Sequence, residues 1–180
     1  MIYIFLADGF EEIEAIAPRD ILKRGGVEVV TVGVTGEMVT SASGLQIKTD
    51  TEIENVDIDN LEGIILPGGM PGTTNLKNNQ KLLDIIKYCF ENKLLIGAIC
   101  AAPSILGEMG VLQGKIACCY PGFEKYLKGA SVSGESVAID QNIITSKGPG
   151  TAMNFGFALL SYLKGKESSD SAKSGMIYKG

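Results

Sequence analysis

Cys100 is the residue of this sequence best placed for covalent chemistry. It follows the aliphatic run 94–99 and precedes two alanines and Pro103, a pattern that predicts a strand turning sharply into a helix at the cysteine. Such a turn exposes a side chain above a sheet, and the free N–H groups and positive end of the following helix favour a thiolate over a thiol. The local sequence also allows an inert core cysteine, which is the commoner case in an apolar run.

Two backbone N–H groups are candidates for holding an oxyanion beside this sulfur. One belongs to Ala101, directly after the cysteine, and the other to Gly69, in the Pro-Gly-Gly turn that follows another apolar run. Glycine at that turn lets the backbone approach closely.

The composition removes the commonest partners of a catalytic cysteine. Histidine is absent from the 180 residues, and with it the commonest general base and the commonest zinc ligand. The cysteines form no CxxC pair, so no metal site is predicted, and a core-forming cytosolic chain does not need disulfides. Cys89 is expected in the core. Adjacent strand residues face opposite ways, so one of Cys118 and Cys119 is expected in the core and the other toward the cleft.

The chain as a whole reads as one soluble globular domain over residues 1–180. Its hydrophobic fraction of 45% and charged fraction of 21% argue against disorder. The net charge of −5 offers no basic surface for nucleic acid. The N-terminal apolar run ends at Asp8, too early for a membrane span, and lacks the features of a signal peptide. A cytoplasmic protein is expected, with residues 166–180 as a polar, loosely packed C-terminal tail.

Strands and helices alternate along the sequence. Strands are predicted at 2–7, 27–34, 63–69 (with its turn), 94–99, 115–120, 136–139 and 142–146, and shorter strands and turns within 36–57. Helices are predicted at about 11–24, 79–92, 101–109 and 148–165. In the first helix Ile13, Ile16, Ala17 and Ile21 are expected to form the apolar face, and Pro18 to kink or restart it.

This alternation predicts an α/β fold with a mainly parallel sheet and helices on both faces. Sites in such sheets lie beyond the carboxyl ends of the strands. The turns in "ADGFEE", "LPGGMPG" and "AICAAP" each follow a predicted strand. We therefore expect these three turns to meet at one edge of the sheet.

Four blocks, "GFEEIEAIAPRDILKRGG", "LPGGMPGTTNL", "AICAAP" and "TSKGPGT", resemble those of the ThiJ/PfpI superfamily, most closely its DJ-one branch. They occur in family order and span roughly residues 1–165. The resemblance implies a flavodoxin-like three-layer sandwich, a homodimer and a reactive cysteine at Cys100. It places the family's acidic partner on Glu14, rather than on Glu11 or Glu12.

A carboxyl group held against a thiolate should have a raised pKa, because two like charges disfavour each other. The proton that Glu14 keeps could then hydrogen-bond to sulfur or to a sulfinate, or pass to a substrate. The alternative interpretation of Glu14 is an exposed acid at a helix start, which is favourable in its own right.

The chain also departs from the family pattern. Ala101 stands where protease-like and amidotransferase-like relatives carry a histidine, which excludes a Cys-His peptidase or amidotransferase in its usual form. Without metal ligands, metal-dependent glyoxalase chemistry is not expected. Tyr120, or else Cys119, occupies the place of a relative's histidine near the site, where Tyr120 could contact a substrate or an anion. Arg24 matches a family arginine near the dimer face, where it could bind an anion or a substrate; a solvated helix end is the other interpretation.

The resemblance implies an enzyme that uses Cys100 and Glu14, without a cofactor, on reactive dicarbonyls such as methylglyoxal. The reaction would be hydration to a hydroxy acid (glyoxalase III type) or release of glycated groups (deglycase type), in protection against oxidative and carbonyl stress. The alternative is a non-catalytic redox sensor or holdase chaperone, in which Cys100 oxidises to a sulfinate. The expected partners are a small aldehyde or dicarbonyl and a second copy of the chain, not nucleic acid or membrane. A nucleotide-binding role is disfavoured, because "LPGGMPG" is no phosphate-binding loop.

Overall fold

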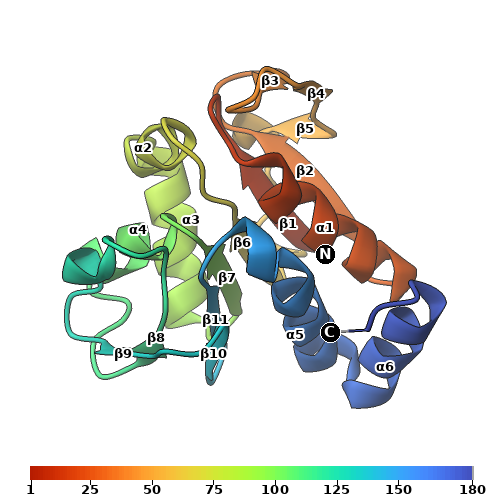
Figure 1. Ribbon diagram of the computed structural model, residues 1–180. Helices are drawn as coiled ribbons and strands as arrows, with labels where there is room; N and C mark the ends of the chain where they lie inside the picture. Colours follow the sequence, from red (N-terminus) through yellow and green to blue (C-terminus); the bar gives the residue numbers. More distant parts are fainter. Residues whose placement is uncertain (180) are drawn as a thin grey trace.

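The computed structural model describes residues 1–179, which are arranged around one seven-stranded sheet (Figure 1). The strand order is β10-β11-β7-β6-β1-β2-β5. The strands are β1 (Ile2–Leu6), β2 (Val29–Gly33), β5 (Thr51–Glu52), β6 (Gly63–Leu66), β7 (Leu95–Ile99), β10 (Val137–Asp140) and β11 (Ile143–Ser146). Neighbouring strands are parallel except β10 and β11, which are antiparallel. The mainly parallel sheet predicted from the sequence is confirmed.

Two small sheets lie outside the main one. In the first, β3 (Met38–Thr40) pairs antiparallel with β4 (Gln46–Lys48). In the second, β8 (Ile116–Ala117) pairs parallel with β9 (Ser131–Val132). The short strands expected within residues 36–57 are therefore present.

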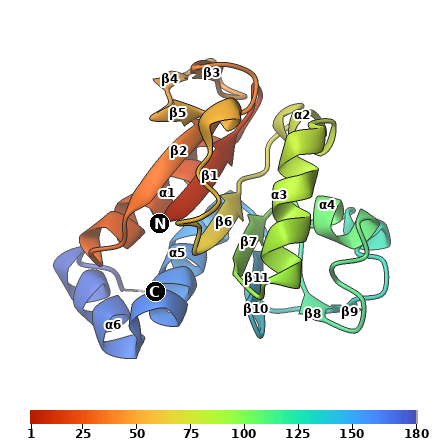
Figure 2. The same ribbon diagram turned by 180° about the vertical axis from the view of Figure 1, so that it is seen from behind.

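Helices cover both faces of the sheet (Figures 1 and 2). One apolar layer is shared with α1 (Glu12–Arg24), α5 (Ala152–Lys164) and α6 (Lys166–Gly175), and the other with α2 (Gly72–Lys77), α3 (Gln80–Glu91) and α4 (Pro103–Glu108). Three 3₁₀ turns, η1 (Ile53–Asn55), η2 (Glu124–Tyr126) and η3 (Pro149–Thr151), complete the elements. Every residue of β1, β6, β7 and β11 is buried, as expected for parallel strands covered on both faces. The fold is a flavodoxin-like three-layer sandwich.

None of the helices within residues 1–179 has both the length and the apolar character needed to cross a membrane.

Helix α1 differs from the sequence prediction in two ways. It does not restart at Pro18 but continues to Arg24. Pro18 is buried against α5, where a Cβ on Gly156 would lie only 3.1 Å from the Cα of Pro18, so tight helix packing supports the segment. The buried stripe also differs, because Ile13 and Ile16 are exposed. Its members are Glu14, Ala15, Pro18, Ile21 and Leu22.

Three further segments depart from the expectations. The predicted strand at 115–120 is limited to β8, since the next residue, Cys118, is instead tied to β11 by its N–H, which donates to Thr145 Oγ1 at 2.9 Å. Cys118 and Cys119 are both buried, so neither is turned toward a cleft. Helix α2 was not predicted; it follows the Met70-Pro71 turn directly and is only six residues long.

The C-terminal segment is the third departure, because residues 166–175 form α6 rather than a loose tail. Ser169 Oγ donates to the Phe157 carbonyl of α5 at 3.0 Å, and the Tyr178 ring lies 4.8 Å from the Phe157 ring. Small buried residues such as Ala172 let the two helices approach despite the polar composition. Gly180, the last residue of the expected tail, lies outside the described residues.

Candidate active site

Three turns meet at the carboxyl edge of the sheet, as the sequence predicted. Strands β1, β6 and β7 are parallel neighbours, so the segments that follow them lie side by side. The segment after β1 enters α1, which carries Glu14. The segment after β6 is Pro67-Gly68-Gly69, and the segment after β7 begins at Cys100.

Cys100 has a left-handed backbone conformation, with a φ of 64°. This conformation is costly for a residue that is not glycine, and it persists only where neighbouring segments hold it. Here the N–H of Cys100 donates to the Ser146 carbonyl at 2.9 Å, and its own carbonyl accepts from the Tyr120 N–H at 2.8 Å. The sharp turn places the thiol above the sheet edge. Cys100 is the one cysteine of the four that is not fully buried.

Glu14 is fully buried beneath this turn. Its Oε2 accepts the Gly68 N–H at 2.8 Å, whereas Oε1 has no hydrogen-bond partner among residues 1–179. Burial raises the pKa of Glu14 to about 7. The direction agrees with the prediction but the cause does not, because the Cys100 thiol, like the Gly68 N–H, lowers this pKa by a smaller amount. A carboxyl group with this pKa is divided between its acid and base forms near neutral pH.

The Cys100 thiol is not acidified, contrary to the expectation from the helix start. Burial, followed by the negative charge of Glu14, raises the pKa of Cys100 to about 12. The N–H groups of Gly69 and Ala101 act in the opposite direction but are outweighed. Glu14 raises the pKa of Cys100 by its charge only when its carboxyl group is ionised. The thiol therefore loses its proton more easily when Glu14 is protonated. The pair therefore favours a single negative charge.

The positions predicted for the oxyanion contacts are consistent with this geometry. Hydrogen bonds from the N–H groups of Gly69 and Ala101 favour the thiolate of Cys100. Gly69 has a φ of 89°, which suits glycine, and its N–H reaches the Cys100 sulfur. The predicted site residues Cys100, Glu14, Gly69 and Ala101 are thus brought together.

Gly68 is a site residue that the sequence reasoning missed. A Cβ at this position would lie 2.7 Å from Cys100 Cβ, 2.8 Å from Glu14 Oε2 and 3.1 Å from the Ala101 nitrogen. Glycine is therefore required here because three segments approach too closely for any side chain, and not because of the turn conformation. The Gly68-Gly69 pair was the available signal in the sequence. Only Gly69 has a positive φ, so the glycine at position 68 needed a different explanation.

Tyr120 lies beside the site, and Arg24 does not. The Tyr120 ring would be 3.2 Å from a Cβ on Gly148, and Glu14 Oε1 would be 4.0 Å from the same point. Arg24 ends α1, about 15 Å along the helix from Glu14, and its Nε pairs with Asp20 at 2.7 Å. Within one chain it does not reach the thiol.

The profile of the DJ-1/PfpI family matches residues 1–162 of this chain. The chain is also similar to the protein dj-1beta of Drosophila melanogaster, with 35% identity covering 97% of this chain and 95% of that protein.

Two further relatives have names that state an activity. A glutathione-independent glyoxalase of Caenorhabditis elegans is 36% identical over 89% of this chain and 87% of its own length. A deglycase of Pyrococcus abyssi is 32% identical over 83% of this chain and 90% of its own length. Among solved structures, oxidised DJ-1 of Toxoplasma gondii matches with a TM-score of 0.95 and 32% identity, covering 99% of this chain and 98% of that one.

Proposed function

Because the chain belongs to the DJ-1/PfpI family, we propose that it converts reactive 2-oxoaldehydes such as methylglyoxal through a covalent bond to Cys100, without glutathione or another cofactor. The observation that carries this proposal is the buried Glu14 carboxyl, with a pKa of about 7, set against the one incompletely buried cysteine. The glyoxalase and deglycase names of two relatives support the substrate class.

The reaction begins when the Cys100 sulfur adds to the aldehyde carbon. The S–C bond forms, the carbonyl oxygen receives the thiol proton through Glu14, and a hemithioacetal results. The Glu14 carboxylate then takes the proton from this carbon and returns a proton to the neighbouring ketone carbon. The proton of the hemithioacetal hydroxyl passes to the ketone oxygen, and the product is a 2-hydroxyacyl thioester. Water hydrolyses the thioester to the 2-hydroxy acid and restores the thiol. One water is consumed, and no oxidant or reductant is needed.

We assign the N–H groups of Gly69 and Ala101 a role in the first of these reaction steps. In our proposal they hold the aldehyde oxygen, on which negative charge develops as the sulfur adds. In a deglycase reaction the Cys100 sulfur would bond to the former carbonyl carbon of a glycated amine or thiol. The bond from that carbon to the amine or thiol would break, and the amine or thiol would leave with a proton.

The proposal is tested by incubating the purified protein with methylglyoxal and no added thiol, and following lactate by proton NMR. Catalytic lactate formation is expected, with many turnovers per chain. Consumption of methylglyoxal without lactate, or with at most one equivalent per Cys100, would overturn it. The redox-sensor alternative uses the same two side chains, and no separate contact in the described structure favours it.

We also propose that the protein is a symmetric dimer in the cytoplasm. Ile13 and Ile16 on α1 are 52% and 41% exposed, and such side chains commonly mark an interface between subunits. Four free cysteines suit a reducing compartment.

Sedimentation equilibrium at micromolar concentration should give about 38 kDa, twice the chain mass of 19.0 kDa. Ile13→Glu should shift the protein toward 19.0 kDa. The matched control Ile139→Glu replaces an equally exposed isoleucine on β10 and should stay dimeric. A wild-type monomer would remove the proposal.

A further inference from the structure

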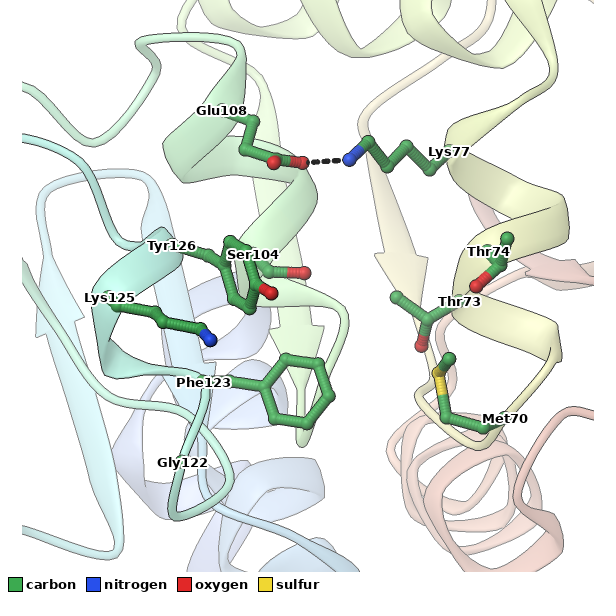
Figure 3. Close-up of a pocket in the computed structure, with 10 residues that line it drawn as sticks. All are labelled: Met70, Thr73, Thr74, Lys77, Ser104, Glu108, Gly122, Phe123, Lys125 and Tyr126. Atoms are coloured by element: carbon green, nitrogen blue, oxygen red, sulfur yellow. Dashed lines mark ion pairs between the residues drawn. The ribbon is translucent and has the colours of Figure 1, made fainter.

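A cavity of about 400 Å³ lies between α2, α4 and the segment 122–126 (Figure 3). None of the mechanistic residues above lines it. Its walls include Met70, Thr73, Lys77, Ser104, Phe123 and Tyr126.

Each wall of the cavity continues a segment of the thiol site. Met70 directly follows Gly69, and Ser104 Oγ donates to the Ala101 carbonyl at 2.6 Å. The wall at 122–126 begins two residues after Tyr120, whose N–H donates to the Cys100 carbonyl. Because the N–H groups of Gly69 and Ala101 hydrogen-bond to the Cys100 sulfur, the cavity begins one residue from a group that contacts the thiol.

The inner surface of the cavity is suited to an aromatic group. The rings of Phe123 and Tyr126 lie 5.9 Å apart, and the Met70 side chain, 54% exposed, faces Phe123 across the cavity (Figure 3). Aromatic rings pack favourably against rings and thioethers. The remaining charges are partnered: Lys125 Nζ lies 5.0 Å from the Tyr126 ring centroid, and an ion pair joins Lys77 to Glu108.

One buried side-chain oxygen in the cavity wall lacks a hydrogen-bond partner. Thr73 is 4% exposed, and its Oγ1 has no hydrogen-bond partner among residues 1–179. Figure 3 shows this oxygen directed toward Met70, whose side chain lines the same cavity. A buried hydroxyl without a hydrogen bond is costly, so a polar group brought to Thr73 from the cavity would be stabilised there.

The cavity is much larger than methylglyoxal needs. Methylglyoxal has five non-hydrogen atoms, whereas a volume of this size is typical of sites for larger ligands. We propose that the cavity holds the substituent of the 2-oxoaldehyde, and that the preferred substituent is an aromatic ring with a hydroxyl group that hydrogen-bonds to Thr73. This inference rests on the proposed function and specifies its substrate class.

The test compares kcat/KM for methylglyoxal, phenylglyoxal and 4-hydroxyphenylglyoxal from initial rates. Phe123→Ala and Met70→Ala should lower the ratio of phenylglyoxal to methylglyoxal by about tenfold, because each removes apolar contact from the ring. Since Met70 is largely exposed, its variant does not put folding at risk. The control Phe90→Ala removes an exposed phenylalanine on α3, outside the cavity, and should leave the ratio unchanged.

Thr73→Val tests the hydrogen bond separately, because valine keeps the shape and removes the hydroxyl. The wild type should prefer 4-hydroxyphenylglyoxal to phenylglyoxal, and the variant should lose that preference. Unchanged ratios in Phe123→Ala and Met70→Ala, or an unchanged preference in Thr73→Val, would overturn the inference while methylglyoxal turnover stands. Absence of turnover with all three aldehydes would instead overturn the proposed function, and the inference with it.

Discussion

Glu14→Gln is expected to abolish dicarbonyl turnover while Cys100 can still be oxidised to the sulfinate. Glutamine keeps a donor beside the sulfur and an acceptor for the Gly68 N–H, but it cannot carry a proton between carbon atoms. Proton transfer by a placed side chain contributes about 10²–10⁴-fold, so the loss in kcat should be at least of that order. Lactate formation measures turnover, and intact-mass spectrometry after peroxide treatment measures oxidation.

Glu14→Asp is the matched variant for this experiment. It keeps the charge and the proton but withdraws them by one methylene, so turnover and oxidation should both weaken. If Glu14→Gln instead converts methylglyoxal at a near wild-type rate, Glu14 is not the acid and base. The enzymatic proposal would then give way to the sensor alternative, since no histidine is present to take the role.

Glu14→Gln also has a consequence for stability that does not depend on any substrate. The folded pKa of Glu14, about 7, lies above its ordinary value of 4.5, so the folded chain binds a proton more tightly than the unfolded chain does. Stability of the wild type should therefore fall as pH rises from 4.5 to 7. Glu14→Gln lacks this loss and should be more stable at pH 8, by about 3 kcal/mol.

Urea unfolding at pH 8 and at pH 4.5 measures this difference. The gain should be present at the higher pH and shrink toward zero at the lower one, because at pH 4.5 Glu14 is protonated in the folded chain and about half protonated in the unfolded chain. A gain that is equal at both pH values would show that Glu14 does not titrate near 7.

Gly68→Ala is the second substitution with a large expected effect. The new Cβ would lie 2.7 Å from Cys100 Cβ and 2.8 Å from Glu14 Oε2, too close for ordinary contact. The backbone of the cysteine turn cannot yield without losing its hydrogen bonds to Ser146 and Tyr120. The carboxyl and the thiol should be forced apart, and a displacement of about 1 Å can cost about 10²-fold in rate.

Methylglyoxal turnover measures this effect, and circular dichroism with urea unfolding checks the fold. Overpacking should cost only about 1–3 kcal/mol, so the variant should remain folded. Gly134→Ala is the control, because a Cβ there would meet nothing within 4 Å. Wild-type turnover in Gly68→Ala would show that the spacing between Glu14 and Cys100 is not critical.

The sequence by itself determined the arrangement of strands and helices and the position of Cys100 within it. The buried runs at 2–6, 63–66 and 95–99 are continuous and apolar, and their strand character is a local property that needs no knowledge of distant segments. Parallel strands share a carboxyl edge, so the convergence of their three turns followed directly. Glu14 was assigned only by the resemblance, because Glu11, Glu12 and Glu14 are alike in local sequence.

Only the tertiary structure decided the chemistry of that edge. The face of α1 that is buried depends on α5 and the sheet, which place Glu14 inside and leave Ile13 outside. The pKa directions of Glu14 and Cys100 follow from burial and from their mutual contact, and neither quantity is encoded in local spacing. The role of Gly68 likewise comes from distances between segments far apart in sequence, which local propensities do not report.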